Sequence, residues 1–265
     1  MGVDFGRTAE DYARHRAGFP AALFDRLGEM GVGRPGEDVV DVGTGTGTAA
    51  RGFAARGCRV IGIDPSTDLL GQARQLDTAA GVGVDYRAAT AEATGLADAS
   101  VDVFSAGQCW HWFDRALAAR EARRVLRPGG AIVICHFDWL PLRGNVVEAT
   151  EALIVEHNPN WHLGGGLGMY PRWTVDVSTA GFSGIKTFSF DVEVPYTHEA
   201  WRGRIRASAG VAASLSPESV ERFDEQHATM LRGRFSTDPL SVPHRVWALV
   251  ARSPGPSRSF EGQAV

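Results

Sequence analysis

The sequence predicts an α/β fold in which helices cover both faces of a seven-stranded, mostly parallel sheet. Apolar runs at 39–42, 59–63 and 101–106 are typical of buried strands, and stretches of helical pattern separate them. A turn with three glycines, at 43–47, follows the first run and leads into an Ala-rich helix, which is the layout of a nucleotide-binding crevice. Asp64 ends the second run, at the spacing where an acidic side chain binds a ribose.

The glycine turn indicates which nucleotide the crevice suits. Its spacing is G-x-G-x-G, from Gly43, Gly45 and Gly47, whereas a dinucleotide turn has G-x-G-x-x-G and places a pyrophosphate on the helix. Glycine lets the backbone approach a ligand closely, and the helix start offers free N–H groups. Asp41, just before the turn, would repel a pyrophosphate but suits an ammonium group. We therefore predict S-adenosylmethionine, a phosphate-free nucleoside with an amine, as the ligand, with its ribose on Asp64.

Capping residues mark the helices in the first half of the chain. Ser66 is the predicted N-cap of a helix that Gly81 ends, and Asp114 is the predicted N-cap of another. A Pro-Gly-Gly turn then leads into the fifth strand. The helices predicted here are 21–30, 49–56, 67–80 and 115–126, and the further strands are 84–88 and 131–135.

The second half is less regular. Residues 137–170 are apolar, aromatic and glycine-rich, which favours a lid or a substrate wall. Their acidic residues, with His157, fit a solvated helix face better than a metal site, so no metal is predicted. The further expected elements are a helix at 173–180, a strand at 184–194, helical structure over 196–234 and a last, antiparallel strand at 242–251. The acidic residues are Glu148, Glu151 and Glu156.

Four segments carry a family resemblance. DVGTGTGTAARGFAARG followed by VIGIDPS resembles the first two motifs of class I S-adenosylmethionine-dependent methyltransferases. AEATGLADASVDVFSAGQCWHWFD followed by RRVLRPGG is similar to the branch of UbiE and trans-aconitate methyltransferase, also called methyltransferase type 11. The resemblance covers about residues 5–140. It implies a Rossmann-like fold with an antiparallel last strand and helical lid insertions.

The resemblance also implies a division of the chain and a cofactor site. Residues 1–37 would be a helical segment over the cofactor, 38–136 the cofactor-binding core, 137–252 the rest of the sheet with lids at 137–170 and 196–240, and 253–265 a disordered tail. The expected cofactor-binding residues are Tyr12, Asp41, Gly43, Thr44, Gly45, Gly47, Asp64, Pro65, Ser66, Leu69, Ala91, Glu92 and Gln108.

The acceptor is expected beyond the fourth strand, because ligands of open parallel sheets sit outside the carboxyl ends of the strands. Methyl transfer is an in-line displacement on an activated cofactor, so the protein mostly supplies position and dryness. His111 is the candidate catalytic base for a phenol, an alcohol or an acidic carbon. A carboxylate acceptor needs no base, and His111 would then only orient it. The predicted substrate residues are His111, Trp112, Trp139 and Tyr170.

The composition of the chain limits the classes of partner that we expect it to bind. The 265 residues carry a net charge of -4, which gives no general attraction to nucleic acid or to an anionic membrane. Three cysteines without metal-ligand spacing fit a reducing cytoplasm, and no apolar run reaches the length of a membrane span. We therefore expect a cytoplasmic monomer or homodimer that methylates a small apolar or aromatic molecule, on oxygen or carbon.

Two other functions stay open at this stage. One is an NAD(P)-dependent oxidoreductase, which the early third glycine disfavours. The other is a protein that keeps the cofactor fold but transfers no methyl group, such as a cyclase. The residues do not separate this second alternative from a methyltransferase.

Overall fold

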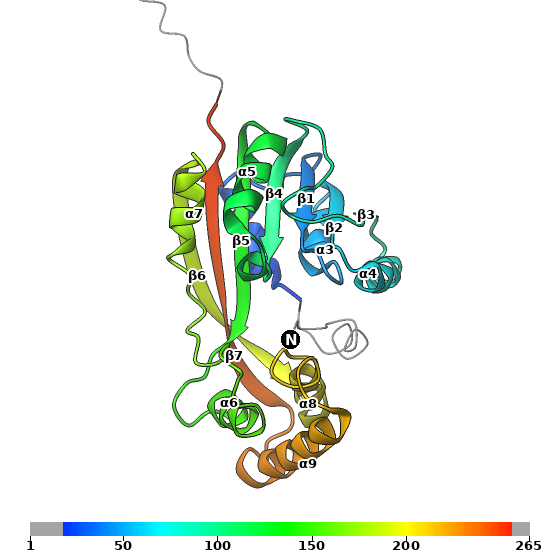
Figure 1. The fold of residues 1–265 in the computed structure, drawn as a ribbon, viewed down its shortest axis with the longest axis vertical. Helices are drawn as coiled ribbons and strands as arrows, with labels where there is room; N and C mark the ends of the chain where they lie inside the picture. Colours follow the sequence, from blue (N-terminus) through cyan, green and yellow to red (C-terminus); the bar gives the residue numbers. More distant parts are fainter. Residues whose placement is uncertain (1–17, 256–265) are drawn as a thin grey trace, which may run out of the picture.

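The computed structural model describes residues 18–255, which form one seven-stranded sheet surrounded by helices (Figure 1). The strand order is β3-β2-β1-β4-β5-β7-β6. β7 is antiparallel to both of its neighbours, and the other neighbouring pairs are parallel. The predicted α/β fold is therefore confirmed. The strands are β1 (Asp38–Val42), β2 (Arg59–Ile63), β3 (Asp85–Arg87), β4 (Val101–Gly107), β5 (Leu126–Trp139), β6 (Ser183–Tyr196) and β7 (Leu240–Arg252).

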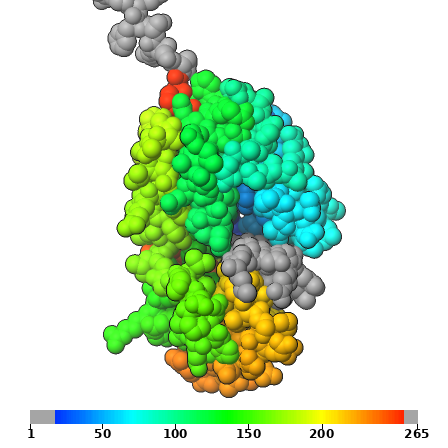
Figure 2. All heavy atoms as spheres, in the orientation of Figure 1, coloured from blue at the N-terminus to red at the C-terminus, as the bar shows by residue number. Residues whose placement is uncertain are grey.

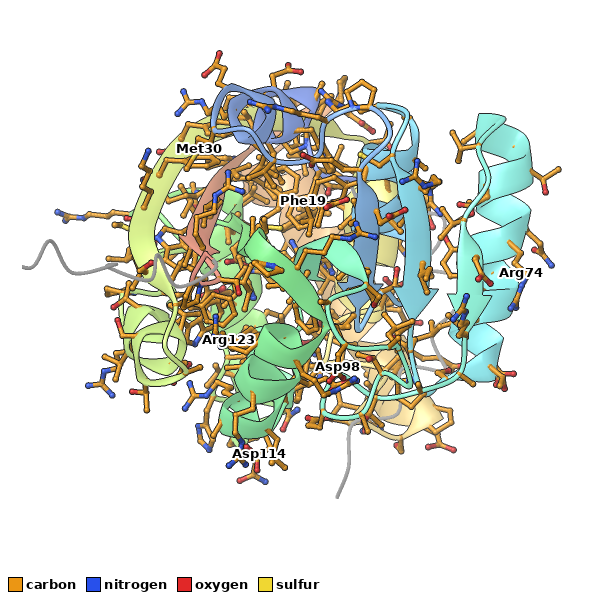
Figure 3. All side chains as sticks on the ribbon, turned by 90° about the horizontal axis from the view of Figure 1, so that it is seen from above. Phe19, Met30, Arg74, Asp98, Asp114 and Arg123 are labelled. Atoms are coloured by element: carbon orange, nitrogen blue, oxygen red, sulfur yellow. The ribbon has the colours of Figure 1, made fainter. Side chains whose placement is uncertain are left out.

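Helices cover both faces of the sheet. Val39 and Val40 are neighbours in β1 and point to opposite faces, where they join two different hydrophobic clusters. One cluster holds α2 and α3, and the other holds α5 and α7. Figure 3 shows α2 and α5 on opposite sides of the sheet. The helices are α2 (Ala21–Glu29), α3 (Thr48–Ala54), α4 (Thr67–Ala80), α5 (Arg115–Val125), α6 (Val146–His157), α7 (Trp173–Thr179), α8 (His198–Arg206) and α9 (Pro217–Arg234).

The caps predicted from the sequence are confirmed. Ser66 Oγ accepts a hydrogen bond from Leu69 N at 3.4 Å and begins α4. Asp114 Oδ1 accepts one from Leu117 N at 3.0 Å and begins α5. Gly81 ends α4 in the left-handed conformation, with φ of 67°. These local interactions set helix positions close to the predicted ones.

β5 is longer at both ends than the predicted strand 131–135. It begins at Leu126, with a register irregularity against β4, and continues to Trp139. β7 pairs with it from Ala131 to Trp139, so the extra residues have backbone partners in a strand from the far end of the chain. Residues 137–139 therefore belong to the sheet, and the insertion begins after them.

The insertion and the following segment form a helical end of the molecule. The insertion is not irregular throughout, because it contains α6. The stretch 196–234 is not one helical run: Tyr196 ends β6, and turns separate α8 from α9. Figure 1 shows α6, α8 and α9 gathered at one end of the long strands β6 and β7. Their shared cluster contains Trp201, Phe223 and Leu231.

The predicted tail is wrong at its first residue. Ser253 is buried, its backbone N–H donates to Gly130 O at 2.8 Å, and its hydroxyl accepts a hydrogen bond from Arg123. Residues 256–265 lie outside the described residues. Within residues 18–255 no helix is long and apolar enough to cross a membrane. In the same range no group of His, Cys, Asp or Glu is arranged to hold a metal ion.

Candidate active site

The three glycines of the turn after β1 all have positive φ: 60° at Gly43, 55° at Gly45 and 78° at Gly47. A Cβ on Gly43 would come within 2.9 Å of Cys109 Sγ, and one on Gly47 within 2.1 Å of the Tyr86 hydroxyl. Among residues 18–255, a Cβ on Gly45 would meet no atom within 4 Å. Gly43 and Gly47 are therefore required by packing, whereas Gly45 borders open space where a ligand could approach the backbone.

Two buried carboxyl groups flank this turn. Asp41 Oδ2 accepts a hydrogen bond from the Thr44 hydroxyl at 2.7 Å, while its Oδ1 has no partner of normal geometry among the described residues. Burial raises the pKa of Asp41 to about 6. Asp64 accepts backbone hydrogen bonds from Gly45 and Ser66, each at 2.9 Å, and burial also raises its pKa. The turn is thus suited to a cation and unsuited to a pyrophosphate.

The other predicted cofactor residues lie around the same edge. Pro65 is exposed and Leu69 half-buried at the start of α4. Ala91 is buried in the core, and Glu92 Oε1 accepts a hydrogen bond from Asp114 N at 3.0 Å, so both already serve the fold. Tyr12 lies outside the described residues. Contact between these residues and a cofactor stays a prediction.

Gln108 turns the chain out of the sheet at the end of β4. It has φ of 60°, which is unusual for a residue other than glycine. Its backbone N–H donates to Cys135 O at 2.8 Å, and its side-chain amide donates to Phe137 O. These two bonds hold the strained residue against β5. The next residues form the short helix η2 (Trp110–Trp112) at the carboxyl edge of the sheet.

A cavity of about 410 Å³ adjoins this edge. Five predicted residues from β4, η2, β5 and the insertion line it together: Gln108, His111, Trp112, Trp139 and Tyr170. Figure 2 shows a recess between the green and cyan parts of the surface, with blue atoms at its floor from the first part of the described chain, which contributes no lining residue to this cavity. The rings of His111 and Trp112 lie 4.6 Å apart.

The cavity also contains side chains that the sequence analysis missed. His136 Nδ1 lies 3.4 Å from Asp138 Oδ1, and the Tyr170 hydroxyl donates to Asp138 Oδ2 at 2.7 Å. Burial raises the pKa of Tyr170, so this hydroxyl remains a donor. The His136 and His111 rings are 5.4 Å apart. His136 and Asp138 alternate with Phe137 and Trp139 along β5, and extending the period of two beyond the predicted strand end would have found them.

The sequence predicts that Glu151 lies on a solvated helix face, and this prediction is wrong. Glu151 is buried and lines the cavity. Its Oε1 accepts a hydrogen bond from Trp139 Nε1 and its Oε2 one from Gly165 N, both at 2.7 Å. Burial raises its pKa. The remaining unpredicted lining residues include Trp161, His162, Leu163, Arg204 and Ser208.

Together, the fold and the site define a class of protein. The structure is a Rossmann-like α/β fold with a glycine turn between two buried acids at the carboxyl edge of the sheet and an aromatic-lined cavity at the end of β4. Residues 40–134 match the family model described as "Methyltransferase domain". This segment of the chain therefore matches a methyltransferase domain, in agreement with the resemblance seen in the motifs.

Individual relatives agree with this family. An uncharacterized methyltransferase of Mycobacterium tuberculosis is 37% identical over 134 residues, which cover 50% of this chain and 51% of that protein. The matched region thus spans about half the length of that relative. The ubiquinone/menaquinone biosynthesis C-methyltransferase UbiE of Rubrivivax gelatinosus is 29% identical over 203 residues. This match covers 71% of this chain and 79% of that protein. A candidate type II methyltransferase from Anaeromyxobacter dehalogenans has a similar structure, with a TM-score of 0.62 and 26% sequence identity. The superposition covers 91% of this chain and 99% of that chain.

Proposed function

We propose that this protein transfers a methyl group from S-adenosylmethionine to an oxygen or carbon atom of a small molecule bound in the cavity. The observation that carries the proposal is the turn at Gly45, which is open to a ligand among the described residues and lies between two buried acids. Cys109, which bonds to Val42 O just before this turn, is next to Gln108 of the aromatic-lined cavity. The family of residues 40–134 supports it.

The residues of the crevice fit the cofactor. Asp41 Oδ1, which has no hydrogen-bond partner of normal geometry among the described residues, suits an ammonium group, and ionisation of Asp41 beside a cation would offset its burial. Each oxygen of Asp64 accepts one backbone hydrogen bond and keeps a lone pair for a ribose hydroxyl. The bound cofactor would supply an activated methyl group on a sulfonium.

The cavity side would hold the acceptor and keep water away. Trp112, Trp139 and Tyr170 supply aromatic walls, and Gln108 is fixed by its bonds to β5. His111 lines the cavity where it could accept the proton of a phenol, an alcohol or an acidic carbon. For a carboxylate acceptor, His111 would orient the ligand without removing a proton.

Calorimetry with S-adenosylmethionine and with NADH tests the cofactor. We expect heat from the first only, and tight NADH binding without S-adenosylmethionine binding would support an oxidoreductase instead. Incubation with methyl-labelled cofactor and a panel of phenols, alcohols and acids then tests transfer. Labelled product together with S-adenosylhomocysteine is expected. A protein that binds the cofactor but forms neither product across the panel would fit the non-methylating alternative.

The role of His111 is tested by His111→Ala. With a phenol acceptor we expect kcat to fall about 10²- to 10⁴-fold, the usual effect of losing a general base. S-adenosylmethionine affinity should stay unchanged. His162→Ala is the control, because His162 lines the same cavity from the insertion and has no assigned proton-transfer role. Unchanged turnover in His111→Ala would remove His111 as the base.

A further inference from the structure

Arg204 differs from the two other arginines of α8. Arg202 and Arg206 both form ion pairs with Asp224 on α9. Arg204 forms no ion pair with a carboxylate of residues 18–255, and its guanidinium instead lies over the ring of Trp139, 4.7 Å from the ring centre. It lines the cavity, so a cation without a carboxylate partner forms part of the cavity wall.

Ser208 adds a second donor beside it. It follows Arg204 by four residues and lies two residues beyond the end of α8. Ser208 is only 7% exposed, and its hydroxyl has no hydrogen-bond partner within the described part of the chain. It lines the same cavity. A buried hydroxyl without a partner costs free energy, which a ligand that accepts its hydrogen bond would recover.

The acidic groups of the cavity are already bonded elsewhere. Asp138 accepts the Tyr170 hydroxyl, and Glu151 accepts Trp139 Nε1 and the N–H of Gly165. Neither carboxylate forms an ion pair with Arg204 among the described residues. Burial lowers the pKa of Arg204, while the nearby Tyr196 hydroxyl and Asp138 carboxylate act in the opposite direction. An anionic ligand would stabilise the charge of Arg204 more than a neutral one.

We infer that Arg204 and Ser208 form a subsite for a carboxylate group of the acceptor. A guanidinium matches a carboxylate with two parallel hydrogen bonds, and the Trp139 ring behind it fixes the orientation of the guanidinium. Arg204 lies on α8 and Ser208 follows the end of that helix, whereas Gln108 and His111 follow β4. The rest of the acceptor can then extend toward the cofactor crevice. Only the identification of the ligand as the acceptor rests on the proposed function.

The test measures binding rather than transfer. Benzoate and 3-phenylpropionate are titrated into the full chain against benzamide and 3-phenylpropionamide, with inorganic phosphate as a further probe. We expect the acids to bind at least about tenfold tighter than their amides, the usual advantage of a hydrogen bond to a charged group. Arg204→Gln should abolish this preference, Arg204→Lys should keep part of it, and Ser208→Ala should weaken it several-fold.

A control variant distinguishes the loss of the subsite from the general effect of removing an arginine. Arg222→Gln removes an exposed arginine of α9 whose guanidinium donates to the Ser219 hydroxyl, and it should leave the preference unchanged. Equal binding of acids and amides to the unmodified protein, or a preference that survives in Arg204→Gln, would overturn the subsite. Phosphate binding tighter than every acid would overturn the carboxylate assignment. If Arg204→Gln does not fold, the preference of Ser208→Ala for acids over amides is the measurement that tests the subsite. Absence of S-adenosylmethionine binding would remove the proposed function while leaving an acid preference intact.

Discussion

At Gly45 the backbone conformation favours glycine, but no packing contact within the described residues requires it. It has φ of 55°, and a Cβ there would meet no described atom within 4 Å. Gly81 shares both properties, with φ of 67° and open space among the described residues, but it ends α4 rather than lying between the two buried acids. The two residues therefore form a matched pair, in which backbone strain is similar and only one position borders the crevice.

We predict that Gly45→Ala and Gly81→Ala each lower the free energy of unfolding by about 1 kcal/mol, because both place a Cβ in the left-handed region. Only Gly45→Ala should also weaken S-adenosylmethionine binding, by more than about tenfold, because its methyl group would occupy space needed by the ligand. Urea unfolding and calorimetry measure the two effects. Unchanged affinity in Gly45→Ala would place the cofactor elsewhere.

Asp41 makes cofactor binding depend on pH. Burial raises its pKa to about 6 without a ligand, and a cationic ligand favours the ionised form. S-adenosylmethionine affinity should therefore rise as the pH increases from 5 to about 6 and then level off by pH 7. Asp41→Asn should bind about tenfold more weakly at pH 7 and show little change over this range. Calorimetry at several pH values measures this, with Asp68→Asn as an exposed control. A slope retained in Asp41→Asn would contradict the assignment.

At the scale of helices and strands, features set by nearby residues could be predicted from the sequence, whereas the pairing of strands far apart in the sequence could not. The caps Ser66 and Asp114 act within three residues, so the sequence pattern locates α4 and α5. The full length of β5 depends on β7, which lies more than a hundred residues later. Gln108 and His111 were predictable because ligands bind at strand ends. Arg204 was not, because three arginines alternate along α8 and only packing against α9 and Trp139 distinguishes them.

Glu151 connects α6, β5 and the glycine-rich segment of the insertion. Glu151→Ala would leave Trp139 Nε1 and Gly165 N without their partner. We predict a loss of about 2 kcal/mol in the free energy of unfolding, the usual cost of unpaired buried donors. Glu156→Ala, on an exposed position of the same helix, should change it by less than about 0.5 kcal/mol. Urea unfolding followed by tryptophan fluorescence compares them, and equal losses would contradict the connection.

At the scale of the whole molecule, β7 joins the sheet to the helical end. Leu249 and Val250 belong to the clusters on the two faces of the sheet, and Leu240 and Val242 belong to the cluster of α6, α8 and α9. The cavity has walls from both parts, since β5 and α8 contribute to it. The proposed acceptor site is therefore built from the helical end as well as from the sheet.

His227 makes the stability of that end depend on pH. It is fully buried, its Nε2 lies 3.2 Å from the Thr150 hydroxyl, and burial lowers its pKa to about 4. An unfolded histidine titrates near 6.5, so the unfolded state binds more protons below that pH. The stability that neutral His227 contributes is thus complete above about 6.5 and is lost as the pH falls toward 4.

We predict that His227 alone lowers the free energy of unfolding by about 2 kcal/mol between pH 7 and pH 5. His227→Leu should be less stable than the unmodified protein at pH 7, because it loses the contact with Thr150, but should lose about 2 kcal/mol less on acidification. His244, whose pKa burial also lowers to about 4, keeps its own part of the pH dependence in this variant. Urea unfolding at the two pH values measures the difference, with His162→Leu as an exposed control. An acid loss in His227→Leu as large as that of the unmodified protein would show that protons bind elsewhere.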